Sequence, residues 1–247
     1  MRTLTKFRNR TRRKTRSHVA SRSDDARNVA RVLTTQAETQ ANYDRIARFY
    51  EPLEGIWERR FRSAAVSALH VGPGESVLEI GSGPGYVLAE FGRLAGPDGV
   101  AVGIDLSSKM CRLARRRLSV ESQTVGVVVQ GDGGQLPFDD SRFDAAFMSF
   151  TLELFDTPQI AVVAAETYRI LRPGGRITVV SLRKEDPAPL MQRGYEWGHS
   201  TFPKLLDCRP IRVGQALAEA GFVIEDDQRL SMWGLPVALV VGSKPPS

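Results

Sequence analysis

The chain has 247 residues, of which 42% are hydrophobic and 25% are charged, so it can fill one large α/β domain and is not a disordered protein. Its formal charge of +6 is unevenly placed, because nine of the 34 lysines and arginines and no acidic residue fall in residues 1–23. The remainder holds 25 basic against 28 acidic residues and gives no electrostatic footprint for binding a polyanion. No apolar run could span a membrane, and the two cysteines lack the spacing of a zinc site. We therefore expect a soluble, cytoplasmic protein without a metal.

The chain divides into an N-terminal region and a larger body. Residues 1–23 are predicted to be a disordered basic tail, with an organellar transit peptide or a contact with RNA or a membrane surface as alternatives. Residues 24–40 are predicted to be a polar linker or a helix, and residues 41–247 one domain. Apolar residues from Asn42 follow helical spacing, with a break at Pro52, and predict two helices before the body begins.

Short apolar runs then alternate with amphipathic helices, which is typical of a parallel sheet covered on both faces. A helix over about Pro210–Ala220 precedes two adjacent strands, so one edge strand is expected to be antiparallel. The predicted fold class is α/β, doubly wound, with a mostly parallel seven-stranded sheet and an antiparallel edge strand. The predicted strands are Ser76–Ile80, Val100–Ile104, Val125–Gln130, Phe143–Met148, Arg176–Leu182, Phe222–Leu230 and Pro236–Gly242.

A glycine-rich turn follows the first predicted strand and reads Gly81-Ser82-Gly83-Pro84-Gly85. Glycines there allow a positive φ and the close approach of a ligand. The spacing does not fit the GxGxxG of dinucleotide-binding folds, because neither frame has a glycine at the third position. It fits ExGxGxG beginning at Glu79, and at this point the sequence resembles the class I methyltransferases that use S-adenosylmethionine (SAM), over residues 41–243. By this resemblance, residues 81–85 pass along the methionine and ribose of SAM, and Glu79 positions the loop or the amino end of the cofactor.

Acidic residues follow the second and third predicted strands. Asp105 lies 20 residues beyond Gly85, where a carboxylate can accept hydrogen bonds from both ribose hydroxyls; the alternative is a helix cap. By the resemblance, Leu106 packs on the adenine ring. Asp132 belongs to a segment that resembles the GDxxxLPF of the family, so Asp132 is expected to accept from the adenine amino group while Gly133 offers its backbone N–H to the ring.

By the resemblance, Ser149 at the end of the fourth predicted strand is expected to contact the cofactor, at the point where the methyl donor meets the acceptor. Family members that methylate planar amines carry Asn/Asp-Pro-Pro-Tyr there, whereas this chain reads Ser149-Phe150-Thr151-Leu152, which favours a small or lipid-like acceptor. The insertion over residues 183–210 is aromatic, and in the family such an insertion covers the acceptor site. We expect Tyr195, Trp197 and Phe202 to contact the acceptor. His199 is the candidate general base, and a packed or solvent-facing histidine is the alternative.

The N-terminal motif over residues 43–50 narrows the resemblance. It resembles the YDxxAxxYD of the ubiquinone/menaquinone-biosynthesis methyltransferases and of related bacterial phosphatidylethanolamine N-methyltransferases. Residues 151–155 depart from the Gly-x-Arg-Asn segment of the quinone enzymes. The resemblance implies SAM-dependent C- or O-methylation of an aromatic, quinol-type acceptor. Three alternatives stay open: N-methylation of a phospholipid or small amine, RNA modification using the basic tail, and SAM binding without catalysis.

Overall fold

The computed structural model describes residue 41 and residues 56–120, 125–201 and 208–246. Five sequence predictions lie outside these residues: the basic tail (1–23), the polar segment (24–40), the first N-terminal helix with its break at Pro52, the opening motif (43–50) and the acceptor contact of Phe202.

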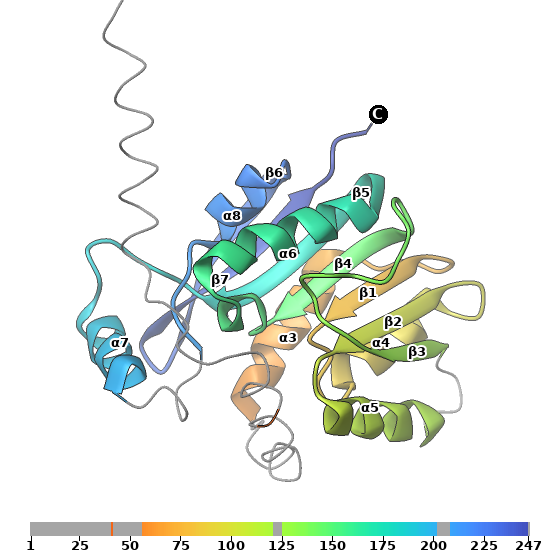
Figure 1. Cartoon of the computed structure of the whole chain (residues 1–247), viewed down its shortest axis with the longest axis horizontal. Coiled ribbons are helices and arrows are strands. Elements are labelled where there is room, and N and C mark those ends of the chain that lie inside the picture. The colour runs from red at the N-terminus through yellow and green to blue at the C-terminus, as the bar shows by residue number, and fades with distance from the viewer. Residues whose placement is uncertain (1–40, 42–55, 121–124, 202–207, 247) are drawn as a thin grey trace, which may run out of the picture.

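Seven strands of the described residues form one sheet in the order β3-β2-β1-β4-β5-β7-β6 (Figure 1). Neighbouring strands from β3 to β5 run parallel, while β7 is antiparallel to both β5 and β6. This arrangement confirms the predicted mostly parallel sheet with antiparallel pairing at one edge. The strands are β1 (Ser76–Ile80), β2 (Val100–Asp105), β3 (Gly126–Gln130), β4 (Phe143–Ser149), β5 (Leu171–Leu182), β6 (Val223–Met232) and β7 (Leu235–Ser243).

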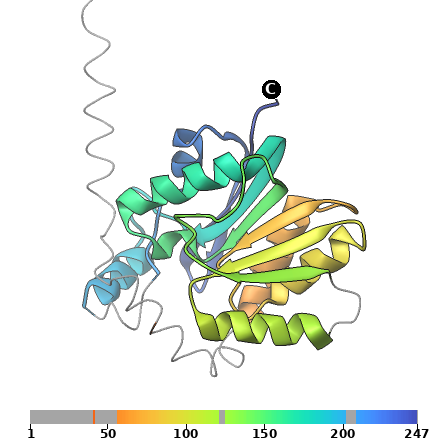
Figure 2. The same ribbon diagram turned by 45° about the vertical axis from the view of Figure 1, so that its right-hand side comes forward.

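Helices cover both faces of this sheet. One core cluster joins the sheet to α6 and α8, and a second joins it to α3, α4 and α5. The view in Figure 2 places α6 and α8, in green to blue, on the side of the sheet opposite to α5, in yellow-green. Strands covered on both faces are mostly apolar, and every residue of β1 is buried, including the polar Ser76 and Glu79. The helices are α3 (Ile56–Leu69), α4 (Tyr86–Ala95), α5 (Ser108–Val120), the short 3₁₀ helix η1 (Leu152–Leu154), α6 (Thr157–Ile170), α7 (Leu190–Thr201) and α8 (Val213–Glu219).

Strand positions agree with the sequence prediction closely, and the differences have local causes. β5 begins five residues earlier than expected, because Leu171 pairs with Phe143 before a register shift that the Pro173-Gly174-Gly175 segment accommodates. α8 is shorter than expected because Ile211 forms a bridge with Arg183 at the end of β5 instead of continuing a helix.

Candidate functional site

The carboxyl ends of β1 to β4 lie at one edge of the sheet, which we call the carboxyl edge. Ile80 at the end of β1 pairs with Ile104 in β2 and with Met148 in β4, and Asp105 pairs with Gln130 at the end of β3. The loops that follow these strands are therefore neighbours. In open α/β sheets this edge is where ligands bind.

The glycine loop after β1 has one side packed and one side open. Gly81, Gly83 and Gly85 all have positive φ, at 74°, 51° and 80°. A Cβ at Gly81 would lie 2.3 Å from Oγ1 of Thr151, and a Cβ at Gly85 would lie 2.8 Å from Cβ of Ala114, so these two glycines allow close packing. A Cβ at Gly83 would meet no atom within 4 Å. Gly83 is therefore where the loop leaves room for a ligand.

Asp105 ties the glycine loop to the end of β2. Its Oδ2 accepts a hydrogen bond from Gly83 N at 2.8 Å, and its Oδ1 accepts one from Ser107 N at 2.8 Å. Each carboxylate oxygen can accept more than one hydrogen bond, which is the property that a ligand with hydroxyl groups would use. The loop after β3 is attached to the same residue, because Gly131 N donates to Asp105 O at 3.0 Å.

The loop after β3 packs against the end of β1. A Cβ at Gly133 would lie 2.8 Å from Cγ2 of Ile80 and 3.2 Å from the ring of Phe155, so only glycine fits there. The carboxylate of Asp132 accepts from Gly134 N at 2.9 Å and is partly exposed. The turn after β1, the acid that ends β2 and the loop after β3 are thus brought together. Whether Asp132 and Gly133 hold an adenine ring stays a prediction.

Other predicted cofactor contacts sit around this cluster. Glu79 is buried in β1, and Leu106 is partly exposed in the loop after β2. The side chain of Ser82 is buried against Gly103, and the backbone N–H of Ser82 donates to Ile104 O at 3.2 Å. Both contacts of Ser82 are with other residues of the protein. Ser149 ends β4, and its carbonyl accepts from Oγ1 of Thr151 at 3.0 Å. The cofactor roles of these residues stay predictions.

Predicted acceptor contacts lie on α7, which the sequence indicated only as an aromatic insertion. His199 is buried in the last turn of α7, whereas Trp197 is 68% exposed. Tyr195 is partly buried, and its hydroxyl donates to Cys208 O at 3.2 Å. Their roles toward an acceptor stay predictions.

Phe150, directly after β4, is a feature that sequence reasoning missed. Its φ of 48° is in the left-handed region, which costs a non-glycine residue energy and is enriched at functional sites. The backbone is held there because Phe150 N donates to Val180 O at 2.9 Å. Its ring meets Phe61 of α3 edge to face, with ring centroids 6.5 Å apart. α3 is thereby attached beside the expected acceptor position.

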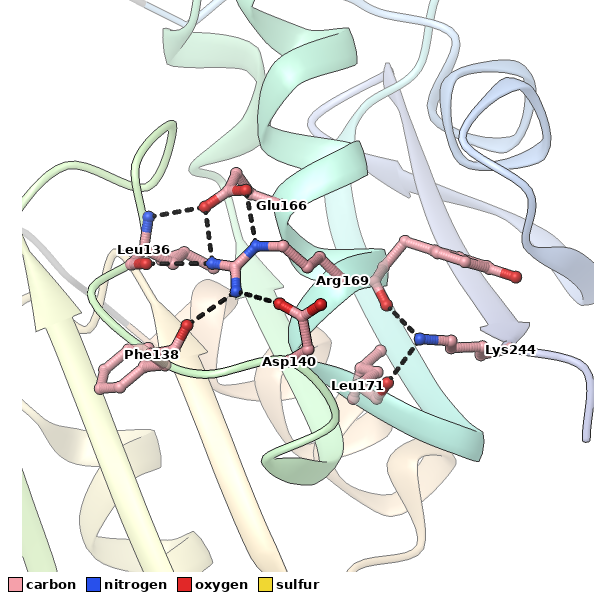
Figure 3. A network of polar contacts seen from close by, with 8 residues as sticks. Leu136, Phe138, Asp140, Glu166, Arg169, Leu171 and Lys244 are labelled. Atoms are coloured by element: carbon pink, nitrogen blue, oxygen red, sulfur yellow. Dashed lines mark hydrogen bonds and ion pairs between the residues drawn. The ribbon is translucent and has the colours of Figure 1, made fainter. Parts of the chain in front are cut away.

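Two arginines brace the cofactor loops from outside, and neither was predicted. Arg117 of α5 donates to Pro84 O at 3.0 Å, and its guanidinium stacks on Tyr86 with 3.3 Å between Cζ and the ring centroid. Arg169 of α6 holds the segment after the β3 loop, donating to Phe138 O at 2.7 Å and to Leu136 O at 3.1 Å (Figure 3). Such contacts join residues 30 or more positions apart, so no local sequence pattern could indicate them.

Glu166 completes this network. It accepts from Arg169 Nε at 2.8 Å and from Leu136 N at 3.0 Å. The hydrogen bond from Arg169 holds the pKa of Glu166 below its ordinary value, despite opposing burial. Arg169 also pairs with Asp140 at 2.8 Å, so one helix face fixes the segment that follows the β3 loop.

The residues described by the structure contain no group of three or more His, Cys, Asp and Glu side chains placed to hold a metal ion. Among the described helices, none has both the length and the apolar character needed to cross a bilayer. The carboxyl edge offers the carboxylate of Asp105, backbone N–H groups and the open position at Gly83. Such a set suits a ligand with vicinal hydroxyls and an uncharged ring.

Comparisons with known proteins agree with this geometry. Residues 77–175 match the family model described as a methyltransferase domain. The demethylmenaquinone methyltransferase of Symbiobacterium thermophilum is 28% identical over 82% of this chain and 90% of its own length. The ubiquinone/menaquinone biosynthesis C-methyltransferase UbiE of Pseudomonas fluorescens is 31% identical over 74% of this chain and 69% of its own. A SAM-dependent methyltransferase from Aquifex aeolicus superposes with a TM-score of 0.60 at 18% identity, covering 80% of this chain and 97% of that one.

Proposed function

The chain belongs to the class I SAM-dependent methyltransferases, and from this premise we propose that it methylates the ring of a quinol that carries a lipid-like tail. The observation that carries the proposal is the extent of similarity to enzymes named for menaquinone and ubiquinone biosynthesis, which reaches 82% of the chain. We favour a ring carbon of the quinol as the methyl acceptor over the other acceptors that the sequence leaves open.

The residues at the carboxyl edge suit SAM. The open position at Gly83 leaves room for the ribose next to the carboxylate of Asp105, whose two oxygens can accept from both ribose hydroxyls. Because the N-cap of α4 is Gly85, which supplies no side-chain cap, and no acid lies in the first turn, the N-terminal N–H groups of α4 suit the methionine carboxylate. We assign the adenine to the space beside Asp132, Gly133 and Leu106.

SAM supplies a methyl group that is already activated by a sulfonium, so the protein needs mainly to align the acceptor with it. A quinol ring carbon becomes nucleophilic when the neighbouring hydroxyl loses its proton. The ring carbon would take the methyl group as S-adenosylhomocysteine leaves, and the proton of the methylated carbon would pass to water, which restores the aromatic ring. We propose that His199 accepts the hydroxyl proton and that Phe150 and Tyr195 pack on the ring.

A direct test uses the purified full chain, SAM labelled in its methyl group, and four acceptors in separate reactions. These are demethylmenaquinol kept reduced, phosphatidylethanolamine, a small aromatic amine and total RNA. The proposal expects label in a ring-methylated quinol, identified by mass. Label in phosphatidylethanolamine, amine or RNA would replace the quinol with that acceptor class. Tight SAM binding by calorimetry with no labelled product in any reaction would favour a SAM-binding protein without catalysis.

A variant of His199, compared with a control variant of His70, tests the proposed general base. His199→Gln should lower kcat for the quinol roughly 100-fold or more while leaving SAM affinity unchanged, because a positioned base contributes in that range. His70→Asn is the control, since His70 is exposed and its Nδ1 lies 2.8 Å from Ala68 O at the opposite edge of the sheet. An equal kcat in both variants would remove His199 from the mechanism.

A further inference from the structure

An exposed apolar surface lies on α7 and on the turn between β6 and β7. We call it the apolar rim, and it consists of Leu190 (81% exposed), Met191 (53%), Trp197 (68%) and Trp233 (66%). The two elements form one surface, because α7 contacts β7 and a Cβ at Gly234 would lie 3.3 Å from Cγ of Met191. Figure 1 also places the β6–β7 turn beside α7. Large apolar side chains that gather in this way mark an interaction surface.

The apolar rim is at the carboxyl edge. β5 ends at Leu182, which pairs with Val237 near the start of β7, and Met232 at the end of β6 pairs with Leu235. The β6–β7 turn is therefore at the same edge as Asp105 and Ser149. A partner that covers the apolar rim would lie next to the expected acceptor position.

The side chains of the apolar rim have the character of a membrane-interface anchor. Leu190, Gly194 and Trp197 share one helix face, since their spacing of four and three residues brings them into line. Arg193 is exposed on the same helix. Tryptophan prefers the boundary between lipid and water, because its ring is apolar and its N–H is polar. Trp233 lies in the β6–β7 turn with a φ of 51°, a conformation unfavourable for this residue, and its side chain is exposed.

Charge selects the kind of membrane. Phe61 of α3 contacts Phe150 at the carboxyl edge, whereas Leu69 O at the other end of α3 accepts from Arg176 Nε near the amino end of the parallel part of β5. The start of α3, at Ile56, thus faces the carboxyl edge. Nine basic residues and no acid lie in residues 1–23. A polybasic segment and an apolar anchor together are a common pair of signals for anionic bilayers.

We propose that the apolar rim docks on an anionic lipid bilayer, next to the place where the acceptor binds. The proposal rests on the proposed function, because an acceptor with a lipid-like tail resides in a bilayer and would reach the site without crossing water.

The test measures co-sedimentation of the full chain with vesicles of phosphatidylcholine mixed with phosphatidylglycerol, in the absence of any acceptor. The variant Leu190→Ser/Trp233→Asn removes two exposed anchors, and asparagine tolerates the left-handed φ at position 233. We expect its partition onto vesicles to fall about tenfold or more. The control variant Leu94→Ser/Val120→Ser removes two exposed apolar side chains from the opposite edge and should bind as the unchanged protein does. Vesicles of phosphatidylcholine alone should bind the unchanged protein more weakly, and added salt should weaken binding to the mixed vesicles.

Three results would overturn the proposal. The unchanged protein could fail to bind the mixed vesicles, the apolar-rim variant could bind them fully, or sedimentation velocity could show a dimer that the variant abolishes. SAM affinity of the variant serves as the folding check. Because no acceptor is present, this outcome is independent of the identity of the acceptor. Methylation of a short-chain, water-soluble quinol without vesicles tests the proposed function separately, and the apolar-rim variant should perform it at an unchanged rate.

Discussion

Gly83 N donates a 2.8 Å hydrogen bond to Oδ2 of Asp105, so the glycine loop after β1 is attached to the acid that ends β2. The second oxygen of the same carboxylate accepts from Ser107 N at 2.8 Å. Asp105 therefore shapes the loop as well as offering acceptors to a ligand. Preorganisation of this kind lowers the cost of binding, since the loop need not be ordered by the ligand.

Asp105→Asn should weaken SAM binding by roughly 1–3 kcal/mol, because the amide presents N–H groups where the carboxylate accepts hydrogen bonds. Isothermal titration calorimetry measures the change. Asp98→Asn is the control, since Asp98 is exposed in the loop before β2, at the amino end of the strands. Equal affinities in the two variants would show that Asp105 does not contact the ribose.

Gly83→Ala should raise the Kd for SAM about tenfold or more, because the added methyl group enters the open side of the loop. Gly74 is a matched control: it has a φ of 82°, and a Cβ there also meets no atom within 4 Å. Each substitution should cost about 1–2 kcal/mol of folding free energy from the left-handed backbone. Only Gly83→Ala should change SAM affinity. If Gly74→Ala weakened binding equally, the effect would come from stability rather than from the site.

Gly81→Ala should destabilise the fold more than either of these variants. Its Cβ would lie 2.3 Å from Oγ1 and 2.9 Å from Cβ of Thr151, so both the side chain and the chain after β4 must move. A loss of roughly 2–4 kcal/mol in the free energy of unfolding is expected from strain and overpacking together. Urea denaturation compares it with Gly83→Ala. A smaller loss for Gly81→Ala than for Gly83→Ala would contradict the packing described for the loop.

Glu166→Gln should destabilise the protein near pH 7 by roughly 1–3 kcal/mol, because Arg169 and Leu136 N lose a charged acceptor. The pKa of Glu166 in the folded protein lies below its ordinary value of 4.5, chiefly through the hydrogen bond from Arg169. Its charge therefore stabilises the fold above about pH 4.5, and this stability is lost as the pH falls through the lowered pKa. The difference between the unchanged protein and the variant should shrink below pH 4.5.

Urea denaturation at several pH values gives this profile. The exposed Glu225 provides the control, and Glu225→Gln should have little effect at any pH. A constant difference for Glu166→Gln from pH 7 down to pH 3 would exclude the carboxylate as its cause.

The two cysteines should differ in reactivity. Burial raises the pKa of the Cys111 thiol to about 11, and the charge of Asp105 acts in the same direction. The thiol is therefore protonated at pH 8 and shielded from a reagent, whereas Cys208 is partly exposed. Ellman's reagent should modify no more than one thiol in the folded protein and both in urea. Rapid modification of folded Cys208→Ser would contradict the burial of Cys111.

The sequence predicted the strands better than the connections between them. β1 was located to the residue, because its apolar run is bounded by a polar segment and a glycine turn. A short connection around Ser231–Leu235 was expected between the last two strands, but the positive φ of Trp233 and Gly234 was not, because tryptophan is an unusual residue in that conformation. α7 was also missed as a helix, since Gly194 and Gly198 interrupt its sequence. The buried Gln192, which bonds with Glu185 and Glu196, further hides the apolar face of this helix.

The candidate site was predictable where chain position alone fixes geometry. Residues at the carboxyl ends of adjacent parallel strands must be neighbours, so Gly83, Asp105 and Asp132 could be placed together from the strand pattern. The packing of Thr151 on Gly81 and the brace from Arg169 depend on long-range contacts that no spacing encodes. The strained backbone of Phe150 was unpredictable for the same reason, because the N–H of Phe150 bonds with the carbonyl of Val180, 30 residues away.

The most direct measurement is a crystal structure of the full chain with S-adenosylhomocysteine, the product that remains when SAM loses its methyl group. The account predicts that both ribose hydroxyls lie within hydrogen-bonding distance of the Asp105 carboxylate, with the ribose beside Gly83 and the adenine ring against the loop that contains Asp132. A ligand bound elsewhere, or a ribose that does not reach Asp105, would contradict it.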